Sequence, residues 1–263
     1  MPSLRVIASK DNALLVRLRK LAADPAAYRR LGEVWLAGDH LCAAFAQRGR
    51  EVPLAVVSEA GWDQPALRAL ASQAASVVVV SGALMAGLSG LESPPSMAFA
   101  VPWPGAGTLL RAAPSVVLDR LQDAGNVGTI LRSAAAFGFT QVVAIKGTSA
   151  LWSPKVLRAG MGAHFSMNLV EGVELGALGV LDVPLLATSS HAVRALGDLP
   201  LPWPCAFAFG HEGQGLSPEL VRLCRAELRI AQPGGEESLN VAAAAAVCLY
   251  ESTRQRAAAD RER

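Results

Sequence analysis

Residues 230–251 read IAQPGGEESLNVAAAAAVCLYE and join a glycine-rich loop to a helix of small residues. Gly234 and Gly235 permit positive φ and let backbone amides come close to a ligand. Ser238 and Asn240 suit the N-cap, where a side-chain oxygen accepts from the free N–H groups of the first turn. The five alanines after Val241 add only methyl groups, so other backbone can lie directly on this helix. The stretch predicts either a tightly packed final helix after a turn or a loop that holds a ligand.

The composition is that of a folded protein. The chain has 263 residues, enough for one large domain or two moderate ones, and it is 52% hydrophobic and 17% charged. It contains no run of eighteen apolar residues, and charges at Arg5, Lys10 and Asp11 stand where a signal peptide needs an apolar core. We therefore expect a cytoplasmic protein with no membrane partner.

The four cysteines are far apart and lack C-x-x-C spacing, and no histidine pair would complete a zinc site. We expect reduced, buried thiols and no metal.

The charge is unevenly distributed along the chain. The net charge of +2 is too small to indicate nucleic-acid binding, but the first fifty residues hold nine Lys and Arg against four Asp and Glu. Within residues 10–23, leucines at helical spacing leave the basic side chains largely off the apolar stripe. This basic amphipathic helix presents either a solvated face or a contact for an RNA backbone.

The chain alternates strand and helix patterns in two blocks. In the first block, strands at 34–37, 54–58 and 77–80 alternate with helices at 39–47, 64–72 and 81–90, and residues 97–101 suit an edge strand. Proline and glycine mark a linker between Trp103 and Ala113. We expect a small α/β/α domain over residues 1–106 and a second domain over residues 107–263.

The second block predicts a parallel sheet covered by helices on both faces, with ligands outside the carboxyl ends of its strands. The expected strands are 115–118, 141–145, 168–170, 184–187, 206–209 and 227–230; the expected helices are 126–137, 154–160, 173–181, 218–224 and the last helix, whose charged end from Arg254 should fray.

Two further loops of this block are rich in glycine and polar residues. In LDRLQDAGNVGTILRSAAAFG (118–138), Asn126 is either an N-cap or a site residue. The helix that follows is apolar nearly all round and should be buried, so Arg132 either seeks an anionic partner there or is simply solvated. In FGHEGQGLSP (209–218), three glycines flank Glu212, and His211 is either a base or a solvated residue. The chain has no dinucleotide fingerprint and no Walker loop.

In order and spacing, the three loops resemble the three sequence motifs of the SpoU (TrmH-like) RNA ribose 2′-O-methyltransferases, within the SPOUT superfamily. The resemblance spans residues 115–252, and residues 1 to about 100 are similar to the small RNA-binding domain that precedes this catalytic domain in many relatives. Three positions depart from the family pattern: Ala231-Gln232 replaces a common Pro-Met, and Ala124 replaces a frequent proline.

The resemblance implies a parallel-sheet domain whose chain threads into a trefoil knot, a homodimer, and S-adenosylmethionine (AdoMet) as methyl donor. It assigns catalysis to Asn126, Arg132, Glu212, Ser238 and Asn240, and donor binding to Thr188, Gly210, Glu212, Gly213, Ile230, Ser238 and Leu239. A guanidinium has a pKa above about 12, so Arg132 is expected to stabilise the incipient alkoxide while water or phosphate takes the proton.

Ribosomal RNA, 23S in particular, is the expected substrate, with transfer RNA as an alternative. A base methyltransferase of the wider superfamily and an RNA-binding member without catalysis also remain open.

Overall fold

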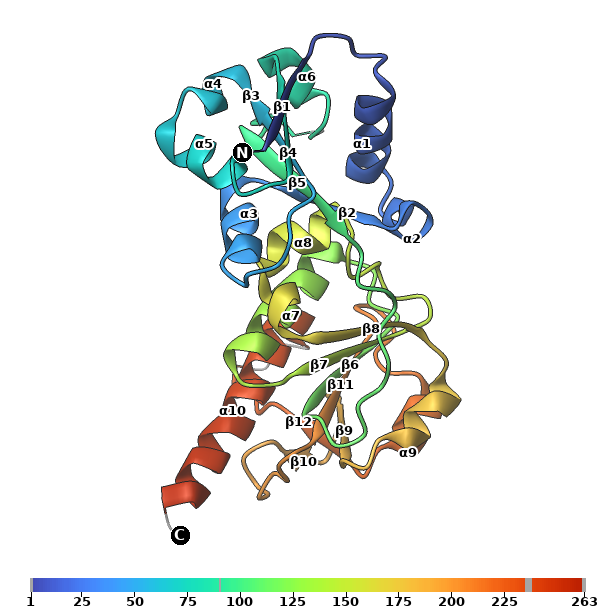
Figure 1. Ribbon diagram of the computed structural model, residues 1–263. Helices are drawn as coiled ribbons and strands as arrows, with labels where there is room; N and C mark the ends of the chain where they lie inside the picture. The colour runs from blue at the N-terminus through green and yellow to red at the C-terminus, as the bar shows by residue number, and fades with distance from the viewer. Residues whose placement is uncertain (1, 90, 235–237, 262–263) are drawn as a thin grey trace. The chain divides into compact units, whose positions relative to one another are not determined.

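A computed structural model describes residues 2–89, 91–234 and 238–261 (Figure 1). The chain forms two compact units, one of residues 1–105 with 152–165 and the other of residues 106–151 with 166–263. The first unit therefore includes a segment that the chain contributes from within the second block. Gly90, at the end of an expected helix, and Gly235, in the expected ligand loop, lie outside the described residues.

The described part of the first unit contains one five-stranded sheet in the order β1-β4-β3-β5-β2. Its strands are β1 (Ser3–Ile7), β2 (Glu33–Ala37), β3 (Leu54–Ser58), β4 (Ser76–Val80) and β5 (Met97–Pro102); its helices are α1 (Ala13–Ala23), α2 (Ala27–Leu31), α3 (Asp39–Ala46), α4 (Glu59–Trp62), α5 (Pro65–Ala71), α6 (Gly82–Ala86) and α8 (Pro154–Gly160). Helix α1 has the predicted leucine stripe, with Leu15, Leu18 and Leu21 buried.

Two strands of this sheet differ from the prediction. Strand β5 was expected at an edge but lies between β3 and β2, antiparallel to both, with Met97–Val101 buried. An apolar run without alternation buries both faces of a strand, which is typical of the inside of a sheet. Strand β1, which was not predicted, occupies an edge beside β4, and its Leu4 is 53% exposed.

In the described part of the second unit, seven strands form one parallel sheet in the order β10-β12-β9-β11-β6-β7-β8. The strands are β6 (Ser115–Asp119), β7 (Gln141–Ile145), β8 (Asn168–Val173), β9 (Leu185–Thr188), β10 (Arg194–Ala195), β11 (Ala206–Gly210) and β12 (Ala226–Arg229). The helices are α7 (Ala124–Ala136), α9 (Pro218–Leu223) and α10 (Val241–Arg261), with the 3-10 turn η2 (Leu175–Val180); the 3-10 turn η1 (Ala163–Ser166) lies almost wholly in the first unit.

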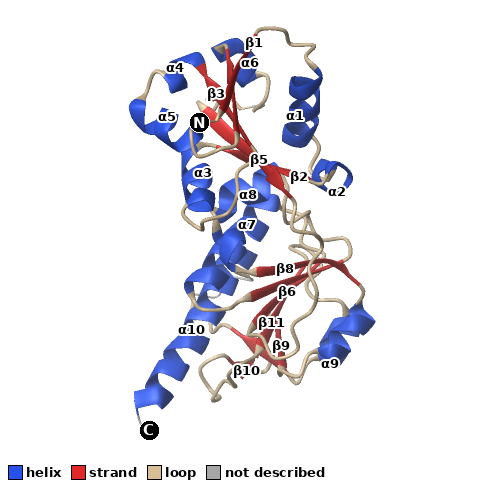
Figure 2. Ribbon diagram, in the orientation of Figure 1, coloured by secondary structure: helices blue, strands red, loops and turns tan. Residues whose placement is uncertain are grey.

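Helices cover both faces of the parallel sheet, as predicted (Figure 2). On one face, Ala206 and Ala208 of β11 belong to a core that includes Leu178 of η2 and Leu220 of α9. On the other, α10 packs against both α7 and β11, and Phe139 contacts Phe207 at 6.1 Å between ring centroids. Neighbouring residues of a strand point to opposite faces. The alanines of β11 therefore pack on the side of η2 and α9, and its phenylalanines pack on the side of α7 and α10.

The last helix is longer and better anchored than predicted. The expectation of a frayed end from Arg254 is wrong for the described residues, because α10 continues to Arg261; residues 262–263 lie outside them. Gln255 Oε1 accepts from the backbone N–H of Leu201 at 2.8 Å, and the Arg256 guanidinium lies 4.6 Å from the centroid of the Trp203 ring. Thr253 Oγ1 donates to the Phe137 carbonyl at 2.9 Å, so α10 also holds the end of α7.

The four cysteines are free thiols, as predicted, but Cys224 is half-buried where burial was expected for all four. Burial raises the pKa of Cys205 to about 11 and that of Cys248 to about 12, which keeps both thiols protonated at neutral pH. None of the described helices is both long and apolar enough to cross a membrane.

Candidate functional site

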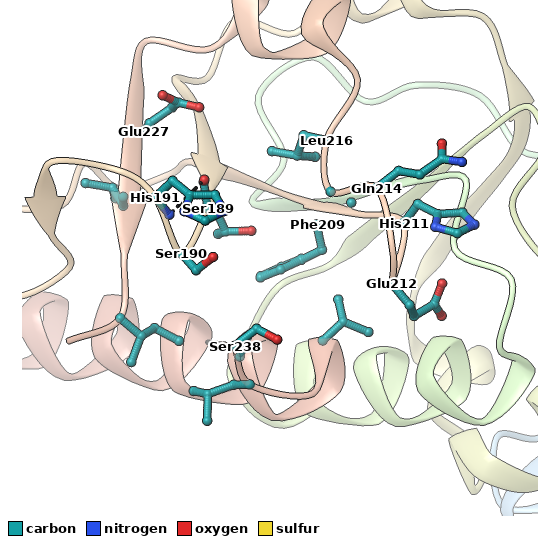
Figure 3. Close-up of a pocket in the computed structure, with 18 of the residues that line it drawn as sticks. Ser189, Ser190, His191, Phe209, His211, Glu212, Gln214, Leu216, Glu227 and Ser238 are labelled. Carbon is teal, nitrogen blue, oxygen red and sulfur yellow. Dashed lines mark hydrogen bonds between the residues drawn. The ribbon is translucent and has the colours of Figure 1, made fainter. Parts of the chain in front are cut away.

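A pocket of about 570 Å³ lies at the carboxyl edge of the parallel sheet (Figure 3). Its walls come from the ends of β9, β11 and β12 and from the first turn of α10. Among the described residues it is lined by Thr188, Ser189, Ser190, His191, Phe209, Gly210, His211, Glu212, Gly213, Gln214, Gly215, Leu216, Val221, Glu227, Leu228, Ile230, Gln232, Ser238, Leu239, Asn240, Val241 and Ala244. Its volume falls within the range of roughly 300–1,000 Å³ that is typical of small-molecule sites.

The motif-two loop (residues 210–217) folds back on itself along one wall. His211 and Gly215 exchange two backbone hydrogen bonds, of 3.0 and 2.8 Å. A Cβ atom at Gly210 would lie 2.1 Å from the carbonyl carbon of Gly215, and Gly215 itself has a φ of +67°. Glycine is therefore required at both positions for this turn to close.

Glu212 ties the motif-two loop to the motif-one loop (residues 119–126). Its carboxylate accepts from the backbone N–H of Gln122 at 3.2 Å, from that of Asp123 at 3.1 Å and from Asn126 Nδ2 at 3.3 Å. Partial burial acts to raise the pKa of Glu212, but hydrogen bonds from its own N–H, these two N–H groups and the Asn126 amide outweigh it and lower the pKa. The carboxylate is thus held ionised as a structural acceptor.

Asp119, which was not predicted, connects the same two loops in the other direction: a carboxylate of the motif-one loop accepts from the backbone of the motif-two loop. Its side chain is 1% exposed at the end of β6, where Oδ2 accepts from the backbone N–H of Ser217 at 2.6 Å and Oδ1 accepts from Arg120 Nε at 3.0 Å. Arg120 Nη1 in turn donates to Gln214 Oε1 at 3.4 Å. The available signal was a carboxylate directly after an apolar parallel strand, at the edge where ligands bind.

Asn126 connects all three loops. It is not the N-cap of α7, because Asp123 Oδ1 takes that role by accepting from the Asn126 N–H at 2.7 Å. The Asn126 side chain instead donates to Glu212 and accepts from Asn240 Nδ2 at 3.0 Å. Asn240 Oδ1 accepts from the N–H groups of Ala242 and Ala243 and so caps α10, as predicted. Ser238 lies before the cap, on the pocket wall.

Arg132 is exposed, which is the solvated alternative of the two that its sequence context left open. The buried side of α7 consists of Val127, Gly128, Ile130, Leu131 and Ala134, whereas Arg132 is exposed. The expectation of a helix buried nearly all round is wrong, because Thr129, Arg132 and Ala136 form an exposed stripe at helical spacing. Arg132 makes no hydrogen bond or ion pair with the described residues and does not line the pocket.

The residues assigned to donor binding converge on the pocket. Thr188, Gly210, Glu212, Gly213, Ile230, Ser238 and Leu239 all line it, and Thr188 Oγ1 is fixed by donating to the Ala208 carbonyl at 2.7 Å. Ser189, Ser190, His191 and Glu227 line it as well and were not predicted. Figure 3 shows Phe209 between this second group and Glu212.

A sequence model of the SpoU rRNA Methylase family matches residues 113–250. The chain belongs to this family. An uncharacterized tRNA/rRNA methyltransferase of Synechocystis sp. is 32% identical over 268 residues, covering 96% of this chain and 95% of that protein. The Bacillus subtilis 23S rRNA (guanosine(2553)-2′-O)-methyltransferase RlmP is 34% identical over 148 residues, covering 54% of this chain and 58% of that protein.

Solved SpoU structures have the same fold. The methyltransferase AviRb from Streptomyces viridochromogenes, in complex with AdoMet, superposes with a TM-score of 0.83 at 25% identity, covering 94% of this chain and 98% of that one. The predicted class, an α/β fold with a parallel-sheet SPOUT domain, is confirmed. The trefoil knot stays a prediction.

The pocket has a volume and a lining that suit AdoMet, the ligand of the AviRb structure. The glycines of the motif-two loop leave backbone accessible to a ligand, while Thr188, Ser189, Ser190 and Ser238 supply hydroxyl groups. The charged lining residues, among those that the structure describes, are carboxylates and include neither Lys nor Arg. An acidic lining suits a ligand with a sulfonium cation.

Proposed function

We propose that the protein transfers the methyl group of AdoMet to a ribose 2′-hydroxyl of RNA, with 23S ribosomal RNA as the favoured substrate. The observation that carries the proposal is the Asn126–Glu212–Asn240 network, which joins the three motif loops beside a pocket suited to the donor. The name of the Bacillus subtilis relative supports both the ribose position and the 23S substrate. We place the reaction in the cytoplasm, without a membrane partner.

AdoMet supplies an electrophilic methyl group on sulfur, so the protein has mainly to position the acceptor oxygen and stabilise its charge. In this proposal Glu212, Asn126 and Asn240 fix the loops, and Ser238 contacts the nucleotide or the donor. Arg132 offers a free guanidinium to the ribose hydroxyl and its phosphate. Because a guanidinium is a poor base, water or phosphate accepts the proton.

The proposal includes a homodimer. The outer side of α10 carries Val247, 41% exposed, and Tyr250, 55% exposed, and the Tyr250 ring contacts Phe137 at the end of α7. A second copy covering this side would bury these apolar groups. Light scattering should give twice the chain mass, and Tyr250→Glu should give the monomer.

We further propose that the domain of residues 1–106 binds RNA and that residues 107–263 form the methyltransferase domain. The cationic excess of the first fifty residues supports this, as does the position of Lys10 and Lys20 on the exposed surface around α1. Exposed lysines can neutralise phosphates and release counterions.

The proposed activity is tested with purified protein, radiolabelled AdoMet and protein-free ribosomal or transfer RNA. Mass mapping of the product should place the methyl group on a ribose of 23S RNA. Label on a base, on transfer RNA only, or on no RNA despite AdoMet binding would each favour one of the rival functions. Mapping ribose methylation in RNA from cells that lack the protein would identify the nucleotide.

A further inference from the structure

Glu227 is a carboxylate of the donor pocket that the proposed reaction leaves without a role. It lies on β12, its residue is exposed, and it makes no hydrogen bond or ion pair with the described residues. Glu212, the other lining carboxylate, is already engaged by Gln122, Asp123 and Asn126. Figure 3 shows the two carboxylates at opposite ends of the pocket.

The charge of the lining is one-sided. Among the described lining residues, Glu212 and Glu227 are acidic and none is Lys or Arg. Arg229 at the end of β12 and Arg225 just before the strand each stand two positions from Glu227, but neither lines the pocket. A concave site lined by one sign of charge concentrates ligands of the opposite sign.

The methyl donor and the product of the reaction differ in charge. AdoMet and S-adenosylhomocysteine share the adenosine and the zwitterionic amino-acid group, and only AdoMet has the positively charged sulfonium. A carboxylate in the pocket lining therefore attracts AdoMet more strongly than S-adenosylhomocysteine, through charge alone.

We propose that Glu227 is a specificity-determining residue, whose unpaired carboxylate makes the pocket prefer the cationic donor to its neutral product. The inference rests on the proposed methyl transfer and adds to it a means of product release. Loss of the sulfonium charge in each turnover weakens the attraction of the pocket for the ligand it still holds. A carboxylate that served only as a hydrogen-bond acceptor for the ribose or the ammonium group would favour both ligands alike.

The test compares dissociation constants of AdoMet and S-adenosylhomocysteine by calorimetry, for the unchanged protein, Glu227→Gln and Glu219→Gln. Glu219 is an exposed carboxylate of α9 outside the donor pocket, paired with Arg222 at 2.9 Å, and is the matched control for charge. For Glu227→Gln we expect AdoMet binding to weaken by about three- to tenfold and product binding by less than about twofold. Raising the salt concentration should lower the preference of the unchanged protein for AdoMet over S-adenosylhomocysteine. In Glu227→Gln the same ratio of dissociation constants should barely change with salt.

The ratio of the two constants decides the proposal, with circular dichroism confirming that each variant is folded. The proposal is supported if the preference for AdoMet over S-adenosylhomocysteine falls in Glu227→Gln and stays unchanged in Glu219→Gln. An unchanged ratio, whether or not both ligands bind more weakly, overturns it, and so does an equal fall in Glu219→Gln. If the unchanged protein binds neither ligand, the proposed methyl transfer fails as well, an outcome distinct from intact binding with a flat ratio.

Discussion

The side-chain amides of Asn126 and Asn240 meet at 3.0 Å although they lie 114 positions apart in the chain. One belongs to the first turn of α7 and the other caps α10, so a single hydrogen bond joins the starts of two packed helices. Each amide also has a second partner, since Asn126 donates to Glu212 and Asn240 accepts from Ala242. The geometry of the donor pocket therefore depends on a short chain of neutral amides and one carboxylate.

Replacement of Asn126 by alanine should weaken AdoMet binding by about tenfold, because a hydrogen bond to a charged group contributes roughly 1.5–3 kcal/mol and this one is partly exposed to solvent. Calorimetric titration measures the effect. Thr129→Ala, one turn later on the exposed side of α7, should leave the dissociation constant unchanged. Wild-type affinity in Asn126→Ala would show that the pocket keeps its shape without the network.

Arg132→Ala should lower kcat by about 10²–10³-fold, the cost of removing one group that stabilises an oxyanion. AdoMet affinity should stay within about twofold of the unchanged protein, because the Arg132 side chain is outside the pocket lining. Arg132→Lys should recover part of the rate. Single-turnover kinetics and calorimetry on the same samples separate the two effects, and a parallel loss of donor affinity would contradict the assignment.

Glu212→Gln should reduce the melting temperature at neutral pH, and this difference should disappear in acid. The hydrogen bonds to Glu212 lower its pKa below the ordinary value of 4.5, so their stabilisation is complete above that value and is lost as the pH falls through the lowered pKa. Thermal melts of both proteins between pH 3 and 7 measure it. A difference that persists unchanged at the acid end would show that the charge of Glu212 does not matter.

Asp119→Asn should destabilise the protein by about 1–3 kcal/mol, because a buried carboxylate that accepts from Ser217 N–H and Arg120 is replaced by a neutral amide. Urea unfolding followed by fluorescence gives the value. Asp198→Asn is the matched control, since Asp198 is exposed and also accepts one backbone N–H, at 3.0 Å from Ala195. Equal losses of unfolding free energy in Asp119→Asn and Asp198→Asn would mean that the burial of Asp119 does not contribute to stability.

Local sequence patterns predicted most of the second unit because its strands are short apolar runs between clear turn residues. Glycine-rich or polar loops after parallel strands also pointed to Glu212 and Ser238, whereas Leu239 was assigned to the pocket only through the family resemblance. Strand β10 escaped prediction because two residues, Arg194 and Ala195, carry no recognisable period.

The misplaced features depend on tertiary contacts that local patterns do not contain. Asn126 was an equally good N-cap candidate by residue type, and only the structure shows that Asp123 takes this position. Helix α7 was expected to be buried nearly all round because its alanines were counted as apolar, whereas exposed Thr129, Arg132 and Ala136 leave one side open. Strand β5 could not be placed within its sheet, because strand order is decided by pairing across the fold.

The long C-terminal helix has a practical consequence for truncated versions of the protein. The family match ends at residue 250, inside α10, yet Gln255 and Arg256 beyond it hold Leu201 and Trp203, which precede β11. β11 runs directly into the wall of the donor pocket. A chain cut at residue 250 would therefore lose the contacts that hold the segment before β11, so a shortened protein should extend through Arg261.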